Sequence, residues 1–147
     1  MLQNCLLRDL TLESVPSNGI RRIEVIATGL PLFGGIQLAV DATLVSAVKA
    51  DGTAQPRAER SDGVRLEESQ RHTERKYPEL LEAQRCKLVV AAMEVGGRWS
   101  EESYFFLDTL AQGRAAEAPK ALRESVFQAC KTRWARIASS GRYGQLC

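Results

Sequence analysis

The sequence has few of the residues that bind transition metals. One histidine, His72, and four cysteines are spread over 147 residues, and no two cysteines form a CxxC pair. A structural zinc site needs four such ligands, usually at short spacings, and this chain does not show them. We interpret the cysteines as free thiols, which are typical of a reducing, intracellular compartment.

Long apolar runs and the common nucleotide or hydrolase motifs are also absent. No stretch approaches the ~20 apolar residues that span a bilayer, and the N-terminal residues lack a signal-peptide pattern, so we expect no membrane association. The patterns GxxxxGK[ST], GxGxxG after a strand, GxSxG and HExxH do not occur. P-loop hydrolysis, Rossmann cofactor binding, serine hydrolysis and zincin chemistry are therefore unsupported.

The totals describe an ordinary globular chain. The apolar fraction is 44%, the charged fraction is 26% and the formal net charge is +2, a charge too small to indicate a nucleic-acid partner by itself. The length fits a single domain spanning residues 1–147 that can bury a core without disulfides.

The pattern along the chain predicts an α/β fold with a small mixed sheet flanked by helices. We expect a short strand within residues 6–15, a turn at residues 16–19 and two strands within residues 21–46. A flexible loop at 49–64, a helix at 65–84 interrupted by Pro78, and a buried strand at 86–95 follow. Helices are expected at 100–118, capped by Ser100, and at 119–140. The strand at 86–95 can return parallel to one strand of the 21–46 pair.

Two carboxylates within residues 21–46 (RRIEVIATGLPLFGGIQLAVDATLVS) are the main candidates for chemistry. Glu24 and Asp41 fall on neighbouring predicted strands, among apolar residues. Two carboxylates with waters and substrate phosphates complete the octahedral shell of Mg²⁺. The alternative is that each carboxylate faces solvent at a sheet edge, or pairs with Arg21 or Arg22.

Two further charged residues could join this pair. Lys76 could reach a metal site from a helix packed over the sheet, or could be a solvated residue among its charged neighbours. Glu94 precedes Gly96 and Gly97 at the end of the buried strand, where it could be a third acidic ligand. It could equally hold a loop through backbone amides, or the glycines could simply end the strand.

The last predicted helix carries basic residues against a single acid, Glu124. The basic residues at this end of the chain are Lys120, Arg123, Lys131, Arg133, Arg136 and Arg142. Basic charge on one element is typical of phosphate binding, and we take Lys131, Arg133 and Arg136 as candidate nucleic-acid contacts. A solvated face opposite the apolar stripe of the same helix explains the charge as well.

Three segments resemble a known family: the 21–46 stretch, ERKYPELL and CKLVVAAMEVGGRWSEE. They are similar to the C-terminal, restriction-endonuclease-like region that follows the reverse transcriptase in certain non-LTR retrotransposon polyproteins, over roughly residues 8–140. The resemblance implies a PD-(D/E)XK-type fold that cuts DNA with Mg²⁺. Glu24 then takes the place of the first acid, Asp41 of the second, Lys76 of a lysine supplied from the helix, and Glu94 of a further acid.

The chain departs from the family pattern in ways that affect the expected function. Glutamate stands where the first motif usually has aspartate, no lysine follows Asp41 by two positions, and the N-terminal helix that opens the nuclease core is missing. The expected function is a divalent-metal-dependent DNA endonuclease-like domain of a retrotransposon-derived protein. The alternatives are a non-catalytic module that binds DNA or RNA, and a non-functional remnant. The expected partner in an intact polyprotein is the upstream reverse transcriptase region, and the expected location is intracellular and nuclear.

Overall fold

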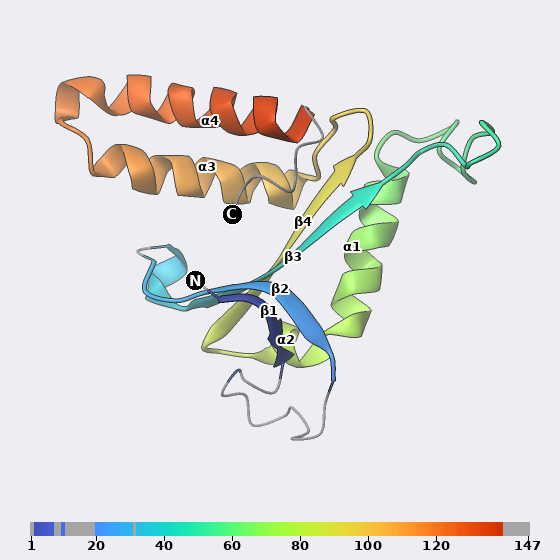
Figure 1. Ribbon diagram of the computed structural model, residues 1–147, viewed down its shortest axis with the longest axis horizontal. Coiled ribbons are helices and arrows are strands. Elements are labelled where there is room, and N and C mark those ends of the chain that lie inside the picture. Colours follow the sequence, from blue (N-terminus) through green and yellow to red (C-terminus); the bar gives the residue numbers. More distant parts are fainter. Residues whose placement is uncertain (1, 8–9, 11–19, 31, 140–147) are drawn as a thin grey trace.

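The computed structural model describes residues 2–7, 10, 20–30 and 32–139 and shows a small mixed sheet with helices on both faces (Figure 1). The strands lie in the order β1-β2-β3-β4. Their bounds are Leu2–Leu6 for β1, Arg22–Ala27 for β2, Gln37–Val45 for β3 and Cys86–Glu94 for β4. The pairs β1–β2 and β2–β3 are antiparallel, and β3–β4 is parallel. The predicted α/β class and the parallel return of the last strand are confirmed.

The first strand lies earlier in the chain than the sequence pattern predicts. It spans Leu2–Leu6, whereas the prediction placed it within residues 6–15. Leu7 and Leu10 are both buried, and the Leu10 N–H donates to the Leu7 carbonyl at 3.1 Å. Leu7 and Leu10 therefore pack into the core next to the end of β1, and the rest of the predicted strand lies outside the described residues. Residues 11–19, with the predicted turn at 16–19, lie outside the described residues.

The helices follow the local stop and start signals closely. Their bounds are Val64–Lys76 for α1, Pro78–Glu82 for α2, Glu101–Ala116 for α3 and Arg123–Ser139 for α4, with short 3₁₀ turns at Phe33–Gly35 (η2) and Lys120–Leu122 (η3). Pro78 stands at the first position of α2, where its missing N–H costs no hydrogen bond. The expected loop corresponds to residues 46–63, which include an isolated bridge between Val48 and Ala54.

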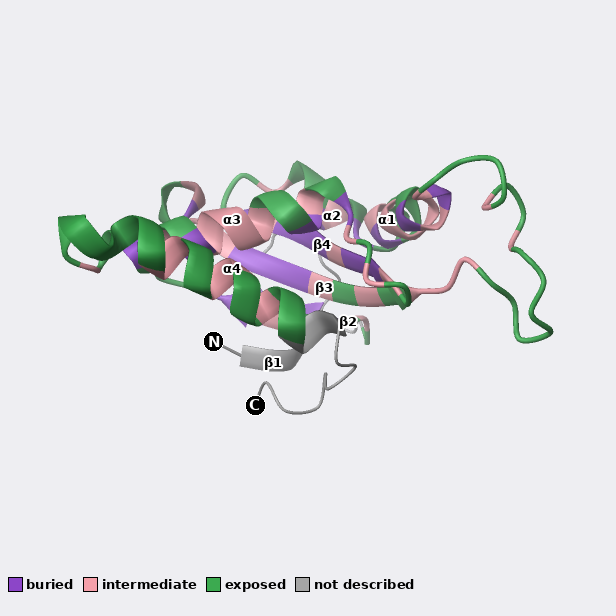
Figure 2. Ribbon diagram, turned by 90° about the horizontal axis from the view of Figure 1, so that it is seen from above, coloured by how far each residue is buried: buried purple, intermediate pink, exposed green. Residues whose placement is uncertain are grey.

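The sheet separates two apolar clusters. On one face α1 and α2 cover a cluster that includes Ala39, Val90, Leu66, Tyr77 and Leu80. On the other face α3 covers a second cluster that includes Leu38, Val40, Leu32 and Val89, against which Phe106 and Leu110 pack. Helix α4 packs on α3, and its outward turns are exposed (Figure 2). Leu32 and Phe33, from the apolar loop between β2 and β3, fold onto this second cluster.

Strand β4 forms one edge of the sheet, and the start of α3 closes that edge. Ser100 caps α3 by accepting a hydrogen bond from the Ser103 N–H at 3.2 Å, as predicted. The Val90 N–H donates to Glu102 Oε2 at 3.3 Å, and Ser103 Oγ donates to the Ala92 carbonyl at 3.1 Å. These contacts occupy backbone groups that would otherwise be open to strand addition. Burial raises the pKa of the Glu102 carboxyl, although the Val90 hydrogen bond opposes the shift.

The described residues also bear on the predictions about membranes and thiols. Within these ranges, no helix combines the length and apolar character that crossing a membrane requires. Cys86 is a buried free thiol, as predicted, and Cys130 is a free thiol that is only partly buried. Burial raises the pKa of the Cys86 thiol, so this sulfur is a packing group rather than a nucleophile.

Candidate functional site

Glu24 and Asp41 lie where the β2–β3 ladder ends. The last residue pair of the ladder in this direction is Val25 with Val40, so the two acids are the next residues on their strands. Glu24 Oε2 accepts a hydrogen bond from the Ala42 N–H at 3.0 Å. The Glu24 carboxylate therefore accepts the hydrogen bond of a β3 backbone N–H that lies beyond the end of the ladder. This contact holds Glu24 beside Asp41.

Asp41 faces α1, and a buried hydroxyl on that helix contacts it. Thr73 is only 3% exposed, and its Oγ1 donates to Asp41 Oδ2 at 3.3 Å. Asp41 itself is half-buried. This hydrogen bond from a buried donor orients the Asp41 carboxylate.

Lys76 is the last residue of α1, one turn after Thr73, and the charges of both carboxylates act on its amine. Its Nζ is 4.7 Å from the centroid of the Tyr77 ring. A hydrogen bond with the Tyr77 side chain is the largest cause that raises the pKa of Lys76, and the charges of Asp41 and Glu24 raise it further. Partial burial opposes the shift. Lys76 is therefore an ammonium ion at neutral pH.

Contacts between β2 and the α1–α2 junction hold Lys76 in this place. The Tyr77 hydroxyl donates to the Arg22 carbonyl. Arg21 donates to the Lys76 carbonyl at 2.7 Å and forms an ion pair with Glu79. We call Arg21, Tyr77 and Glu79 the junction clamp. The sequence left open whether Arg21 neutralises Glu24, and the structure pairs Arg21 with Glu79 instead.

The junction clamp predicts a stability change at acidic pH. The hydrogen bond from Arg21 lowers the pKa of Glu79, so the ion pair stabilises the fold above the ordinary glutamate pKa and loses this contribution as pH falls through the lowered value. Glu79→Gln should remove about 1 kcal/mol at pH 7 and much less at pH 3. Urea unfolding of both proteins at the two pH values measures this. An equal difference at both pH values would contradict the prediction.

Glu94, the third predicted acid, is not brought to the other two. In the parallel ladder Asp41 is opposite Val90, and Glu94 is opposite Val45, four residues further along, or about 13 Å at the rise of a strand. The Glu94 carboxylate lies 3.8 Å from Arg98 Nε. The Glu94 N–H donates to the Arg98 carbonyl at 2.7 Å. Glu94 therefore contacts the β4–α3 turn through the Arg98 side chain and its own backbone N–H, and not through a carboxylate bound to backbone amides as one alternative had it.

The same turn includes Gly97 at φ +89°, a conformation that glycine adopts without strain.

Within the described residues, no group of three or more His, Cys, Asp or Glu side chains is placed to hold a metal ion. The metal ligands predicted from the sequence are therefore reduced to the pair Glu24 and Asp41.

The three basic candidates on α4 do not share one face. Lys131 pairs with Asp108 of α3 at 2.8 Å, and its Nζ is 5.2 Å from the Phe127 ring centroid. Arg133 lies about 160° around the helix from Lys131 at 100° per residue, and Arg136 is exposed. The packing of α4 on α3 thus engages one of the three and separates it from the others.

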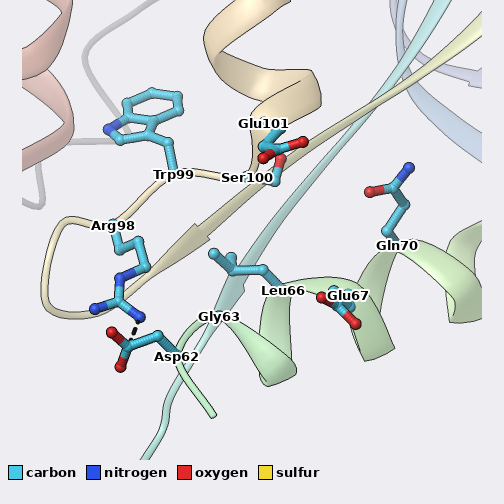
Figure 3. Close-up of a pocket in the computed structure, with 9 residues that line it drawn as sticks. All are labelled: Asp62, Gly63, Leu66, Glu67, Gln70, Arg98, Trp99, Ser100 and Glu101. Carbon is cyan, nitrogen blue, oxygen red and sulfur yellow. Dashed lines mark ion pairs between the residues drawn. The ribbon is translucent and has the colours of Figure 1, made fainter.

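A polar pocket of about 540 Å³ lies elsewhere, between the starts of α1 and α3 (Figure 3). It is lined by Asp62, Gly63, Leu66, Glu67, Gln70, Arg98, Trp99, Ser100 and Glu101. Arg98 pairs with Asp62 at 3.3 Å. Three carboxylates and one guanidinium give this pocket a negative balance that does not suit phosphate. None of the site residues predicted from the sequence lines it.

Sequence reasoning placed Lys76 on a helix over the sheet but missed Thr73 and Tyr77. Thr73 and Tyr77 follow the buried Leu66 at i+7 and i+11, a helical spacing that marks them as facing the sheet. Two strands and one helix supply the carboxylates, the ammonium and the hydroxyl.

A scan against protein-family models, a search of curated proteins and a search of solved structures each found no match to this chain.

Proposed function

We propose that the chain is a Mg²⁺-dependent endonuclease-like domain that hydrolyses phosphodiester bonds in DNA, as the resemblance to retrotransposon proteins implies. The observation that supports it best is the convergence of Glu24, Asp41 and the Lys76 ammonium from β2, β3 and α1. Acidic ligands beside a fixed cation suit a reaction in which a negatively charged phosphate gains further negative charge.

The residues present fit a hard divalent cation. Glu24 is exposed and Asp41 is half-buried, so both carboxylates have access to water. Mg²⁺ is commonly held by one or two carboxylates, with waters and substrate phosphates as the other ligands. When bound, the ion would lower the pKa of a coordinated water and polarise the phosphate.

The side chains of this chain have separate roles in the proposed reaction. Thr73 orients Asp41, and the Glu24 contact with the Ala42 N–H fixes the second carboxylate. Lys76 is protonated, so it acts as a cation that attracts the phosphate and stabilises its developing charge, not as the base that takes a proton from water. A water oxygen bonds to phosphorus and gives up a proton to bulk solvent, the phosphorus–oxygen ester bond breaks, and the leaving oxygen takes up a proton from solvent.

A non-catalytic nucleic-acid-binding module is the second candidate. It is supported by the junction clamp, which contacts the backbone of Lys76 and its neighbour Tyr77 and would serve phosphate binding as well as catalysis. A restriction-endonuclease-like core, an upstream reverse transcriptase partner and a nuclear location belong to the same proposal.

Nicking of supercoiled plasmid by the purified chain tests the proposal. We expect relaxed circles to appear with Mg²⁺ or Mn²⁺, and none to appear with EDTA. DNA binding without nicking in either metal would reject hydrolysis and favour the binding module. Neither binding nor nicking, from a chain that unfolds cooperatively, would reject both candidates.

A further inference from the structure

Helix α1 has opposite charge on its two sides. Along one side a stripe recurs at i, i+4, i+7 and i+11, which we call the basic stripe: Arg65, Ser69, His72 and Lys76. Along the other side a stripe recurs at i, i+3 and i+7, which we call the acidic stripe: Glu67, Gln70 and Glu74. Residues at these spacings share a helix side, and the two stripes are roughly 140–200° apart at 100° per residue.

The packing of α1 places the two stripes at different parts of the molecule. Lys76 ends the basic stripe beside Asp41 and Glu24. The acidic stripe faces the start of α3, where Glu67 and Gln70 line the polar pocket together with Glu101 (Figure 3). The sheet edge at β4 is therefore acidic, and the side of α1 nearest the proposed site is basic.

The basic stripe has cations that are partly or fully open to solvent. His72 and Lys76 are exposed. The Arg65 side chain is 31% exposed and forms an ion pair with Glu68 through Nη1, while its Nε is buried. On α4, by comparison, Lys131 is already held by Asp108.

We propose that the basic stripe of α1, and not α4, carries the DNA backbone to the Glu24–Asp41–Lys76 site. The stripe spans about 16 Å along the helix axis, the rise of roughly five base pairs of a duplex, and ends at the residue proposed to contact the reacting phosphate. This inference rests on the proposed function for its ligand, but it does not require that the chain cut DNA.

The acidic stripe disfavours DNA binding on the β4 side of α1. A duplex centred on the β4 edge would meet the carboxylates of Glu67 and Glu101, which repel phosphate. A duplex displaced toward β2 would meet Arg65, His72 and Lys76. Charge complementarity therefore selects one side of α1.

Two arginines on α1 provide a matched test. Arg65→Gln removes a cation from the basic stripe, and Arg71→Gln removes a cation about 120° away on the same helix. Each change lowers the net charge by one and breaks one ion pair within the helix, with Glu68 or Glu67 respectively. Affinity of the full chain for a labelled 20-base-pair duplex is measured by fluorescence anisotropy in EDTA, over a series of KCl concentrations.

We expect Arg65→Gln to weaken binding several-fold and to reduce the slope of log affinity against log salt by about 0.9, the value for one lost phosphate contact. Arg71→Gln should leave the slope unchanged. Glu68→Gln, which releases Arg65 from its ion pair, should strengthen binding. Arg136→Gln tests α4 and should have little effect.

Three results would overturn the inference. These are equal losses in Arg65→Gln and Arg71→Gln, a loss confined to Arg136→Gln, or no salt-dependent binding by the unaltered chain. Because binding is measured without divalent metal, a chain that binds through α1 but never nicks plasmid would reject the proposed hydrolysis and support the stripe. A chain that nicks plasmid but loses binding only in Arg136→Gln would do the reverse.

Discussion

Asp41→Asn is expected to reduce metal-dependent plasmid nicking by at least about 100-fold, because an amide in place of the carboxylate removes one of two charged ligands for the cation. The fold should persist. Asparagine is nearly isosteric, and its side-chain oxygen can still accept the hydrogen bond from Thr73 Oγ1. The measurement is the rate of nicking at saturating Mg²⁺, together with the thermal unfolding midpoint of each protein.

Asp51→Asn is the matched control for this change. Asp51 lies in the loop between β3 and α1, where its carboxylate accepts hydrogen bonds from the Thr53 N–H and hydroxyl. It lies outside the proposed site, so nicking should be unchanged. Normal nicking by Asp41→Asn would contradict the assigned role. Equal losses of nicking and folding in that variant would assign Asp41 to the fold alone.

The second large effect is expected at Tyr77, the largest fully buried side chain among the described residues. Its ring fills the junction between α1 and α2, and its hydroxyl donates to the Arg22 carbonyl. Tyr77→Phe should lower the free energy of unfolding by about 0.5–1.5 kcal/mol, since a part-buried hydrogen bond to the Arg22 carbonyl is lost. Tyr77→Ala should cost about 3–5 kcal/mol, because it also leaves a cavity.

Urea unfolding followed by circular dichroism measures both changes. Tyr104→Phe is the control, because Tyr104 is 52% exposed on α3 and should change stability by no more than about 0.5 kcal/mol. A Tyr77→Phe protein as stable as the unaltered chain would show that the Arg22 contact does not hold the junction.

Most secondary structure was predictable because its signals are local. Alternation marked β3, a continuous apolar run marked β4, and Pro78 marked the break between α1 and α2. The first strand spans Leu2–Leu6, earlier than the predicted range of 6–15. Leu7 and Leu10 are buried and are joined by a backbone hydrogen bond, so apolar residues there did not mark a strand.

The candidate site was predictable only in part. Alternation on neighbouring strands placed Glu24 and Asp41 together, and the family resemblance indicated Lys76. The error at Glu94 came from strand register, which depends on where the crossover returns and is not encoded near residue 94. The Arg21–Glu79 pair joins residues 58 apart in sequence, and only tertiary packing determines such a partner.

The basic residues of α4 illustrate the same limit. Counting charges along α4 could not show that Asp108 of α3 pairs with Lys131. The basic and acidic stripes of α1, in contrast, can be read from the i, i+4 and i+7 spacings of its charged residues. Which stripe lies beside the proposed site depends on how α1 packs over the sheet.

Manganese titration of the ¹⁵N-labelled chain tests the metal site most directly, because the paramagnetic ion broadens the amide signals of residues close to it. We predict that substoichiometric Mn²⁺ broadens the amides of Glu24, Asp41 and Ala42 first, and that excess Mg²⁺ restores them. Broadening first at Glu67 and Glu101, with the Asp41 signal still sharp, would place the cation in the acidic pocket and contradict a metal site on β2 and β3.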